Sequence, residues 1–575
     1  MSSTVVDIEF GTALIRPADA RIAIIANAFQ TVDETLAHYR MAADDEEVLN
    51  RNNEFYLERY RAMIPTIDGA PREIIDAVNA MRAASGSESL IDEHNSCSLN
   101  GVYLYSFLSR NGYEGKVELI DNLDLEIERA RRIVTTSDIV LLSTTFITSV
   151  DTIVRLARLM KEWNPRAKVI VGGAKLTQYA DESEIVEAAR SADALILSPN
   201  GEKTLLRMIP RLMDGRSVEG LLNVAYHDGE FHRSSRNLPD GVDIDSNFVR
   251  WSDLPSSIVR SSLNLRTGRG CPFKCKFCTF PSYNDQKVDL MSTESVIAQL
   301  REIQRMPEVK SVRFVDDTLF LNRKHLISVC QGMIDIGFDL PWTAYLRSTT
   351  LTDESCRYLS EAGCKLVLVG VESADQTVLD NMLKGTKEAH NWTAAANLAK
   401  YGILGFAFIL TGFPGETRAS VDKTIDFLNN SGIQSYVHSP LFVFPNSPVA
   451  KEAQAFGLTG GFNDWAHPTM DCRTAIEESS RIFQEVTRCG YIDRGSSVTK
   501  VLLDHGYSVD QVKDLAISHN QIARDEMNGT STAAAVANFR RLALDNNIGA
   551  ASVGAFTSPY ARTGGALHIN SSARY

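Results

Sequence analysis

The chain has 575 residues, which is more than one hydrophobic core usually organises, so two to four domains are expected. A hydrophobic content of 44% and a charged content of 23% are typical of a globular protein, and no apolar run reaches the roughly 18 residues of a membrane span. The formal net charge of -13 argues against broad binding to nucleic acids or acidic membranes.

Residues 1–20 show no clear period and lack the basic start and apolar core of a secretory signal. The nine cysteines form no even framework of pairs, which favours a reducing, cytoplasmic compartment. We therefore expect residues 1–20 to be an N-terminal extension of a cytoplasmic protein.

Residues 21–221 alternate short apolar runs with helical patterns, such as the one at 150–163, where apolar residues recur every three to four positions. The alternation predicts an α/β domain built on a doubly wound parallel sheet. The expected strands lie at residues 21–29, 116–121, 138–146, 168–173 and 192–198. A long polar segment at 32–89 predicts a helical insertion of unknown role after the first strand.

Residues 222–261 are irregular and rich in Asp, Ser and Pro, which indicates a linker. Six strand-and-helix units follow within residues 262–456 and predict a partial (β/α)6 barrel, because a complete eightfold barrel takes about 250 residues. Residues 457–547 are mostly helical and are expected to help cap the barrel. The last segment, 548–575, is rich in Gly, Ala and Ser and indicates a flexible tail.

Three cysteines lie within eight residues directly after the first strand of this barrel: Cys271, Cys275 and Cys278. That position is at the C-terminal mouth, where such barrels carry their chemistry. Thiolates favour zinc or iron–sulfur clusters. Zinc usually takes four ligands in two paired knuckles, and the sequence has no second Cys-x-x-Cys, although a distant fourth ligand or three structural thiols are alternatives. In a four-iron cluster, three cysteines leave one iron open to a substrate or cofactor.

The motif Cys-x-x-x-Cys-x-x-Cys, with Phe277 before the last cysteine, resembles the signature of the radical SAM superfamily, and the resemblance covers residues 263–448. It implies a 4Fe–4S cluster whose open iron chelates S-adenosylmethionine (SAM). The reduced cluster then cleaves SAM to a 5′-deoxyadenosyl radical, or the enzyme uses the SAM methyl group. The resemblance also implies an external electron donor such as flavodoxin or ferredoxin.

Residues at the ends of the next barrel strands match positions at which this superfamily contacts SAM. Asp316 and Asp317 match contacts to the amino group, with a turn or N-cap carboxylate as the alternative. Arg347 is a candidate for bidentate pairing with the SAM carboxylate, with a surface ion pair as the alternative. Glu372 and Ser373 fall where the superfamily binds the ribose.

The loop at residues 411–417 resembles the one that approaches the adenine of SAM in this superfamily. Its glycines, Gly412 and Gly415, are candidate binding residues, and the alternative is that they serve only a tight turn.

The N-terminal sheet resembles the cobalamin-binding domain of the B12-dependent class of radical SAM enzymes. At its strand ends, that family wraps the corrin and its nucleotide tail, and the rule for doubly wound sheets independently places a ligand at this edge. The matching residues are Ser143, Thr144, Thr145, Gly172 and Gly173. The alternative is an empty sheet whose glycines only serve turns.

The motif Asp-x-His-x-x-Gly, whose histidine ligates cobalt, is not in place. Residues 92–94 begin it, but Cys97 stands where the glycine should be. Members of this class that lack the histidine bind cobalamin with no protein nitrogen below the metal, so the resemblance still implies cobalamin binding.

With both cofactors, the resemblance implies a cobalamin-dependent radical SAM methyltransferase of class B. Cobalamin takes a methyl group from one SAM and becomes methylcobalamin. A second SAM yields the radical that activates an unactivated carbon (or phosphorus) centre of a small molecule or natural-product intermediate, as in antibiotic biosynthesis. The sequence singles out no catalytic side chain. The alternatives are a radical SAM enzyme that catalyses a rearrangement or cyclisation, with cobalamin bound non-catalytically or not at all, and an inactive SAM- or B12-binding regulator.

Overall fold

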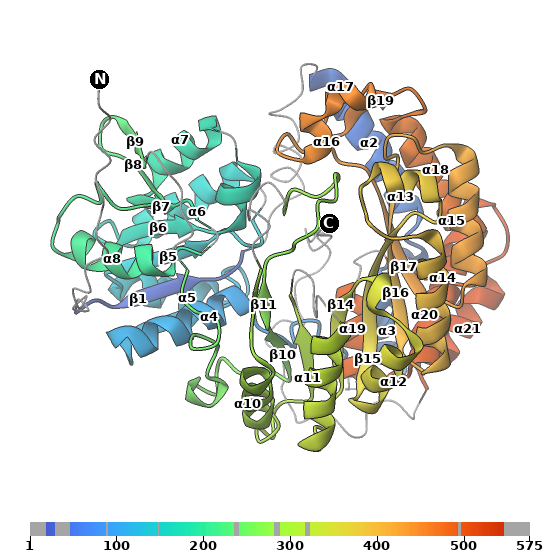
Figure 1. Cartoon of the computed structure of the whole chain (residues 1–575), viewed down its shortest axis with the longest axis horizontal. Coiled ribbons are helices and arrows are strands. Elements are labelled where there is room, and N and C mark those ends of the chain that lie inside the picture. The colour runs from blue at the N-terminus through green and yellow to red at the C-terminus, as the bar shows by residue number, and fades with distance from the viewer. Residues whose placement is uncertain are drawn as a thin grey trace.

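The structure is a computed structural model of the chain, and its elements form two lobes that lie side by side (Figure 1). One lobe is built on an N-terminal sheet, and the other combines a second sheet with the C-terminal helices. The structure describes residues 19–28, 46–87, 90–147, 149–180, 182–198, 200–234, 241–280, 288–316, 323–492 and 496–545. Within these residues, no helix combines the length and the apolar character that a membrane span needs.

A seven-stranded sheet forms the core of the N-terminal lobe, in the order β4-β1-β5-β6-β7-β8-β9. Its strands are β1 (Ile22–Ile25), β4 (Val117–Ile120), β5 (Ile139–Ser143), β6 (Lys168–Gly172), β7 (Ala194–Ile196), β8 (Val224–His227) and β9 (Phe231–Arg233). Strands β1 and β4 to β7 are parallel and coincide with the five predicted runs, and their order is the flavodoxin-like order of a doubly wound sheet. The predicted α/β fold is confirmed.

Helices cover both faces of this sheet, and the buried side chains form a separate apolar cluster on each face. Ile24 packs into one cluster and its neighbour Ile25 into the other, as the alternation of a strand requires. Residues of α4 and α8 belong to the first cluster, and residues of α5, α6 and α7 to the second. The helices are α4 (Leu99–Leu108), α5 (Ile127–Thr136), α6 (Val150–Trp163), α7 (Glu182–Ser191) and α8 (Glu202–Met213).

Residues 224–233 extend the sheet, although a linker was expected over residues 222–261. Strand β8 pairs antiparallel with β7, and β9 pairs antiparallel with β8. Both strands are short, and half of β8 and most of β9 are only half-buried. Neither has the continuous apolar run of a strand buried on both faces. The linker prediction is wrong for this part of the chain.

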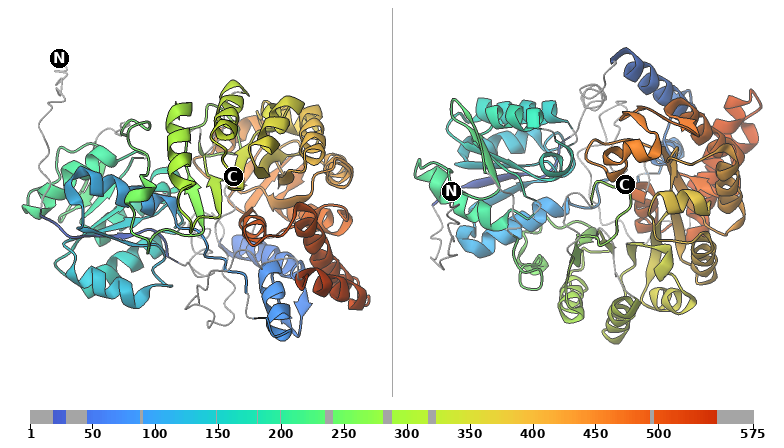
Figure 2. Two further views of the ribbon diagram at one scale, coloured as in Figure 1. Left: turned by 90° about the horizontal axis from the view of Figure 1, so that it is seen from below. Right: turned by 45° about the horizontal axis from the view of Figure 1, so that its top comes forward.

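The second sheet has seven parallel strands, in the order β10-β13-β14-β15-β16-β17-β21, and helices flank it on the outside (Figure 2). The strands are β10 (Ser262–Leu265), β13 (Ser311–Phe314), β14 (Trp342–Leu346), β15 (Cys364–Glu372), β16 (Leu404–Thr411), β17 (Ser435–Pro440) and β21 (Gly490–Tyr491). The helices are α10 (Thr293–Ile303), α11 (Arg323–Asp335), α12 (Asp353–Glu361), α13 (Gln376–Asn381), α14 (Glu388–Lys400) and α15 (Arg418–Asn430). The six predicted units are present, and β21 adds a short seventh strand from a region expected to be mostly helical.

Helix α19 (Ser496–Asp504) packs against the inner face of this open barrel. Its last residue, Asp504, forms a buried ion pair with Arg313 of β13. The strand register places Arg313 on the face opposite to that of Gly405. That other face meets the outer helices, because a Cβ at Gly405 would lie 3.1 Å from Leu398 of α14. A chain segment from outside the sheet therefore occupies the inside of the barrel.

The described part of the predicted insertion packs against the C-terminal region rather than against the N-terminal sheet. Its elements are α2 (Glu46–Ala62), β2 (Thr66–Ile67), β3 (Ala70–Pro71) and α3 (Ile74–Ala84). Asn52 Nδ2 donates to the Asn463 carbonyl at 2.9 Å, and Arg82 Nη2 donates to the Tyr507 hydroxyl at 3.1 Å. Figure 1 shows α2 beside α18 (Cys472–Glu485) and β19 (Asp464–His467). Residues 46–84 are thus part of the barrel lobe.

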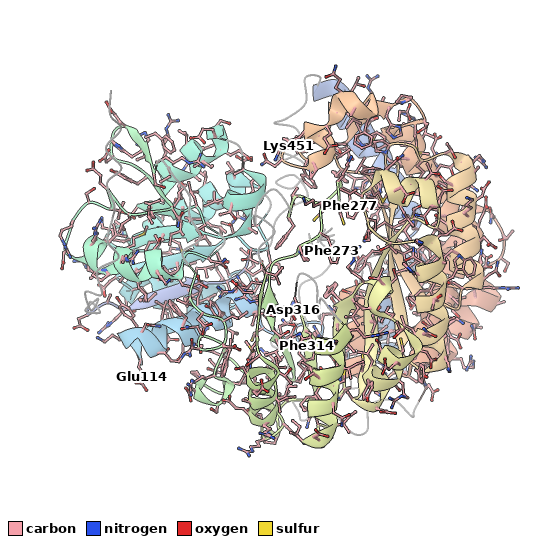
Figure 3. The ribbon with its side chains drawn as sticks, viewed as in Figure 1. Glu114, Phe273, Phe277, Phe314, Asp316 and Lys451 are labelled. Carbon is pink, nitrogen blue, oxygen red and sulfur yellow. The ribbon has the colours of Figure 1, made fainter. Side chains whose placement is uncertain are left out.

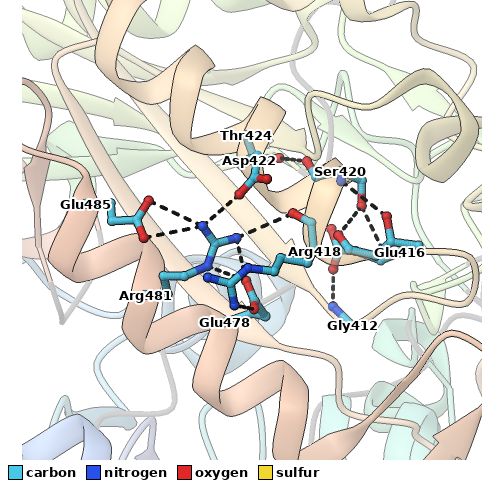
Figure 4. Close-up of polar contacts among 10 residues, drawn as sticks. Gly412, Glu416, Arg418, Ser420, Asp422, Thr424, Glu478, Arg481 and Glu485 are labelled. Carbon is cyan, nitrogen blue, oxygen red and sulfur yellow. Dashed lines mark hydrogen bonds and ion pairs between the residues drawn. The ribbon is translucent and has the colours of Figure 1, made fainter.

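An ion-pair network fastens α18 to α15 (Figure 4). The C-terminal elements are α16 (Pro448–Lys451), α17 (Ala453–Phe456), β18 (Thr459–Gly461), β19 (Asp464–His467), β20 (Met470–Asp471), α18 (Cys472–Glu485), α20 (Val509–Met527) and α21 (Ala533–Ala543). Arg481 of α18 pairs with Glu478 at 2.6 Å and with Asp422 of α15 at 2.7 Å, and Arg418 pairs with Glu478 at 3.2 Å. The network holds α18 against the helix that directly follows the loop at 411–417.

Candidate cofactor-binding site

The three cysteines of the predicted cluster site lie on one loop at the C-terminal mouth of the barrel. The loop follows β10 and a two-residue strand, β11 (Gly268–Arg269), which pairs antiparallel with β12 (Asp289–Leu290). Burial, with smaller contributions from the nearby Cys275 and Cys271, raises the pKa of Cys278 to about 12. Thiols in such surroundings ionise when a positive metal centre binds them.

Aromatic residues of the same loop pack beside these thiols. Phe277 and Cys275 share an apolar cluster with residues of β16, the segment after β17 and the C-terminal region, and Figure 3 shows Phe273 and Phe277 on the side of the barrel lobe that faces the N-terminal lobe. Among the described residues, no three His, Cys, Asp or Glu side chains converge on a single metal ion.

Arg347 lies against the cysteine loop rather than in a surface ion pair. Its guanidinium stacks over Phe273 at 3.7 Å from the ring centre, and its Nη1 lies 3.9 Å from Cys275 Sγ. Its Nη2 donates to the carbonyl of Lys384 and to Thr386 Oγ1. The buried Nε has no partner among the described residues. Arg347 is thus a cation beside the predicted cluster, with one donor left over.

Glu372 occupies a strained position at the end of β15. Its φ is +62°, a value that residues other than glycine rarely adopt, and the pairing with β16 is irregular at this point. Oε1 forms a buried ion pair with Lys384 Nζ at 2.7 Å. Gly370 leaves the space for that pair, because a Cβ there would lie 2.6 Å from Oε1. Oε2 is buried with no partner among the described residues, so it is an acceptor available to a donor such as a hydroxyl group.

Two other predicted SAM contacts are engaged within the protein. Asp316 accepts hydrogen bonds from the backbone N–H groups of Thr267 (2.7 Å) and Gly268, and so it anchors the start of the cysteine loop. Ser373 Oγ accepts from the backbone N–H of Asp375 at 3.2 Å, at the start of α13. Asp317 lies outside the described residues. The SAM-binding role of all three stays a prediction.

The loop at 411–417 requires both of its glycines. Gly412 has φ +91°, and a Cβ there would lie 2.6 Å from both Trp465 and Ala475. Gly415 has φ +95°, and a Cβ there would lie 2.2 Å from Asn381 Nδ2. Turn geometry and close packing therefore explain these glycines, and a contact with adenine stays a prediction.

The predicted cobalamin-binding residues lie together at the carboxyl edge of the N-terminal sheet. Gly172 ends β6, and Gly173, the next residue, has φ +127°. A Cβ at Gly173 would lie 2.9 Å from both the backbone nitrogen and Oγ1 of Thr144. Thr144 Oγ1 is buried without a partner among the described residues. At this edge, a glycine lets neighbouring atoms approach the backbone closely, and a buried hydroxyl oxygen has no partner among the described residues. Both features fit a bound ligand.

Asn100, which the sequence did not single out, lies at the point where the strand order reverses. From the first turn of α4, its Nδ2 donates to Ser143 Oγ at 2.6 Å and to the carbonyl of Ala26 at 3.0 Å, and so it links β5 to β1. Ser143 Oγ in turn donates to Thr145 Oγ1 at 3.1 Å. Cys97, in the place of the missing motif, instead donates its thiol to the Ile258 carbonyl at 2.7 Å.

A buried ion pair joins the two lobes between these sites. Arg269 of β11 contacts Glu202, the first residue of α8, at 2.6 Å, with side-chain exposures of 8% and 6%. The hydroxyl of Tyr103, on α4, accepts from Arg269 Nη2 at 2.8 Å and donates to Glu202 at 2.9 Å. Arg269 stands two residues before Cys271, and α8 begins at the carboxyl edge of the N-terminal sheet. The sequence analysis missed these residues, because no local pattern marks a contact between partners 67 positions apart.

Comparisons with known proteins agree with this geometry. Residues 265–428 match the radical SAM superfamily. The chain is 26% identical to an uncharacterized methyltransferase of Pyrococcus horikoshii over 62% of this chain and 79% of that protein. It is 25% identical to the anaerobic magnesium-protoporphyrin IX monomethyl ester cyclase of Rubrivivax gelatinosus, over 56% of this chain and 60% of that protein. The structure of the radical SAM methyltransferase TsrM from Kitasatospora setae, with cobalamin and a 4Fe–4S cluster bound, superposes with a TM-score of 0.57 at 14% identity, over 75% of this chain and 96% of TsrM.

Residues 265–428 therefore form a radical SAM domain, and the superfamily's cofactors are a 4Fe–4S cluster and SAM. More particularly, the chain shares the fold of TsrM: an N-terminal, mostly parallel sheet, a radical SAM barrel and a helical C-terminal region.

Proposed function

We propose that this chain is a cobalamin-dependent radical SAM methyltransferase that methylates an unactivated carbon or phosphorus centre of a small molecule, using a 4Fe–4S cluster, SAM and methylcobalamin. One observation carries the proposal: the Arg269–Glu202 contact brings the cysteine-bearing mouth of the barrel to the carboxyl edge of the N-terminal sheet. Two cofactor sites that face each other in this way suit a reaction that needs both. The cluster with SAM supplies a 5′-deoxyadenosyl radical, and cobalamin supplies a transferable methyl group.

In the barrel, each candidate residue has a distinct task. Cys271, Cys275 and Cys278 hold the cluster. Glu372 accepts a hydrogen bond from a ribose hydroxyl through its unpartnered Oε2, and Arg347 offers its unused Nε–H to the SAM carboxylate. The other contacts predicted from the sequence complete the proposed site: Asp316, Asp317, Ser373, Gly412 and Gly415.

In the N-terminal lobe, the carboxyl edge of the sheet is the proposed cobalamin site. Gly172 and Gly173 let the ligand approach the backbone closely, and Thr144 Oγ1 is a free hydrogen-bonding atom there. Asn100 lies at the same edge beside Ser143, where it orients the polar groups of this site. We further propose a cytoplasmic location and an external one-electron donor for the cluster.

Anaerobic reconstitution with iron, sulfide and hydroxocobalamin tests the proposal. We expect the wild type to retain one 4Fe–4S cluster and one corrin. The variant with Cys271→Ala, Cys275→Ala and Cys278→Ala should lose the iron and keep the corrin, whereas Cys330→Ala, a buried thiol on α11, should keep both. With SAM labelled in its methyl group and a strong reductant, the wild type should transfer label to the corrin and release 5′-deoxyadenosine. A normal cluster without any retained corrin contradicts the proposal.

A cyclisation reaction is the second candidate, and the resemblance to the cyclase of Rubrivivax gelatinosus favours it. The two candidates leave different products from SAM. A methyltransferase forms S-adenosylhomocysteine as well as 5′-deoxyadenosine, because one SAM donates its methyl group. A cyclase forms 5′-deoxyadenosine alone, so chromatography of the spent nucleosides distinguishes them.

A further inference from the structure

The contact between Arg269, Glu202 and Tyr103 joins two charged side chains where water is excluded. The Tyr103 hydroxyl donates a hydrogen bond to Glu202 and accepts one from Arg269, and the Arg269 guanidinium also lies 5.4 Å from the centre of the Tyr103 ring. Arg269 Nε and Glu202 Oε2 are buried without partners among the described residues. The pair is therefore not fully compensated by hydrogen bonds.

Such a contact is a poor source of net stability. Removing two charges from water costs free energy that the ion pair repays only with complete hydrogen bonding, and apolar residues of similar volume often serve stability as well or better. Its best-attested effect is to specify one geometry, because a displaced partner would leave a buried, unpaired charge. Here the geometry in question is that of the two lobes.

The position of Arg269 connects that geometry to the cluster. Two residues of chain span at most about 7 Å, so a displacement of Arg269 is transmitted to Cys271 with little slack. The segment is also closely packed, because a Cβ at Gly241 would lie 3.3 Å from Arg269 Nη1 and 2.9 Å from Asn200, two residues before Glu202. The strand β11 that carries Arg269 pairs with β12, which lies just before α10 of the barrel.

We propose that Arg269 is a positioning residue that, through Glu202 and Tyr103, sets the distance between the cysteine-bound cluster and the ligand of the N-terminal sheet. The inference rests on the proposed function, because it requires a corrin at that sheet. Arg269, Glu202 and Tyr103 bind neither cofactor in this proposal. Loss of their contact should therefore alter the distance between the cluster and the corrin and leave the amounts of bound iron and corrin unchanged.

Pulsed EPR on frozen, reduced protein measures this separation directly. Cob(II)alamin and the reduced 4Fe–4S cluster are both paramagnetic, and their dipolar coupling depends on their distance. We expect one narrow distance in the wild type and a broadened or lengthened distribution in Arg269→Met and Glu202→Gln. The matched control is Glu184→Gln, which breaks the equally buried Lys175–Glu184 pair inside the N-terminal lobe (side-chain exposures 0% and 6%) and should keep the wild-type distance.

The double variant Arg269→Met, Glu202→Leu separates positioning from stability. It leaves no unpaired charge, so it should fold even where the single variants do not, and it should still lack the narrow distance. Wild-type distances in the folded variants, with normal iron and corrin contents, would overturn the inference.

If the wild type retains no corrin, the proposed function fails, and hydrogen exchange then decides this inference separately. The backbone of residues 268–280 should exchange faster in Arg269→Met than in the wild type and in Glu184→Gln. Equal exchange in all three proteins would overturn the positioning role.

Discussion

Glu416, in the loop after β16, is a carboxyl group whose ionisation should weaken that loop as the pH rises. The side chain is 2% exposed and accepts a hydrogen bond from the backbone N–H of Gly412 (Figure 4). Burial raises its pKa from 4.5 to about 8; the Gly412 bond opposes the shift, and the negative charges of Glu478 and Asp375 add to it. Between pH 4.5 and 8 the closed loop therefore holds a proton that the opened loop releases.

The sign follows from this difference in bound protons. The opened state binds fewer protons over this range, so the opening free energy falls as the pH rises, by up to about 1.4 kcal/mol per pH unit. From pH 5.5 to 7.5 the free energy of opening the wild-type loop should fall by up to about 3 kcal/mol. Glu416→Gln keeps an oxygen acceptor for the Gly412 N–H but cannot ionise, so its opening free energy should stay level.

Hydrogen exchange of the peptide spanning residues 411–417, corrected for the intrinsic pH dependence of exchange, measures this opening free energy. Glu485→Gln is the control, because Glu485 pairs with Arg481 in the neighbouring network but has a side chain that is 48% exposed, so it should leave the wild-type slope intact. A wild-type loop whose opening free energy is as level as that of Glu416→Gln, or rises with pH, refutes the reasoning.

Three further predictions concern the cofactor sites and the barrel. Gly173→Ala places a Cβ at φ +127° against Thr144, which strains the backbone by roughly 1–3 kcal/mol, and it should lower corrin retention while the iron content stays normal. Gly215→Ala, with open space around its Cβ, is the control and should retain the corrin. Equal corrin retention by both variants would count against the site. Glu372→Gln should weaken SAM binding to the reconstituted protein by about 1.5–3 kcal/mol in calorimetry, and an unchanged affinity would remove Glu372 from the site. Asp504→Asn leaves Arg313 buried without its counter-charge and should lower the free energy of unfolding by about 3–5 kcal/mol, whereas a loss below about 1 kcal/mol in denaturant titration would contradict that account.

Features that depend only on short segments of the sequence could be predicted without the structure. The alternating strands and helices follow from local hydrophobic periodicity, and the cysteine loop falls directly after β10 as expected. The glycines at 172–173, 412 and 415 were recognisable as special positions, because a strand end followed by glycine indicates an unusual backbone. The hairpin of β8 and β9 was missed for the converse reason, since its residues are only half-buried and carry no continuous apolar pattern.

The order of the strands and the meeting of the lobes were decided by the tertiary structure. Residues 46–84 join the barrel lobe through contacts such as that between Asn52 and Asn463, which are 411 positions apart. The unpartnered Oε2 of Glu372 also depends on tertiary packing, because Lys384 and Gly370 surround the carboxylate and leave only Oε2 available to a ligand. By itself the sequence determined three thiols on a barrel loop and a sheet edge that is predicted to bind a ligand, because both patterns are local. Only the folded chain decided how these two sites face each other, because the Arg269–Glu202 pair that joins them exists only after distant segments pack and exclude water.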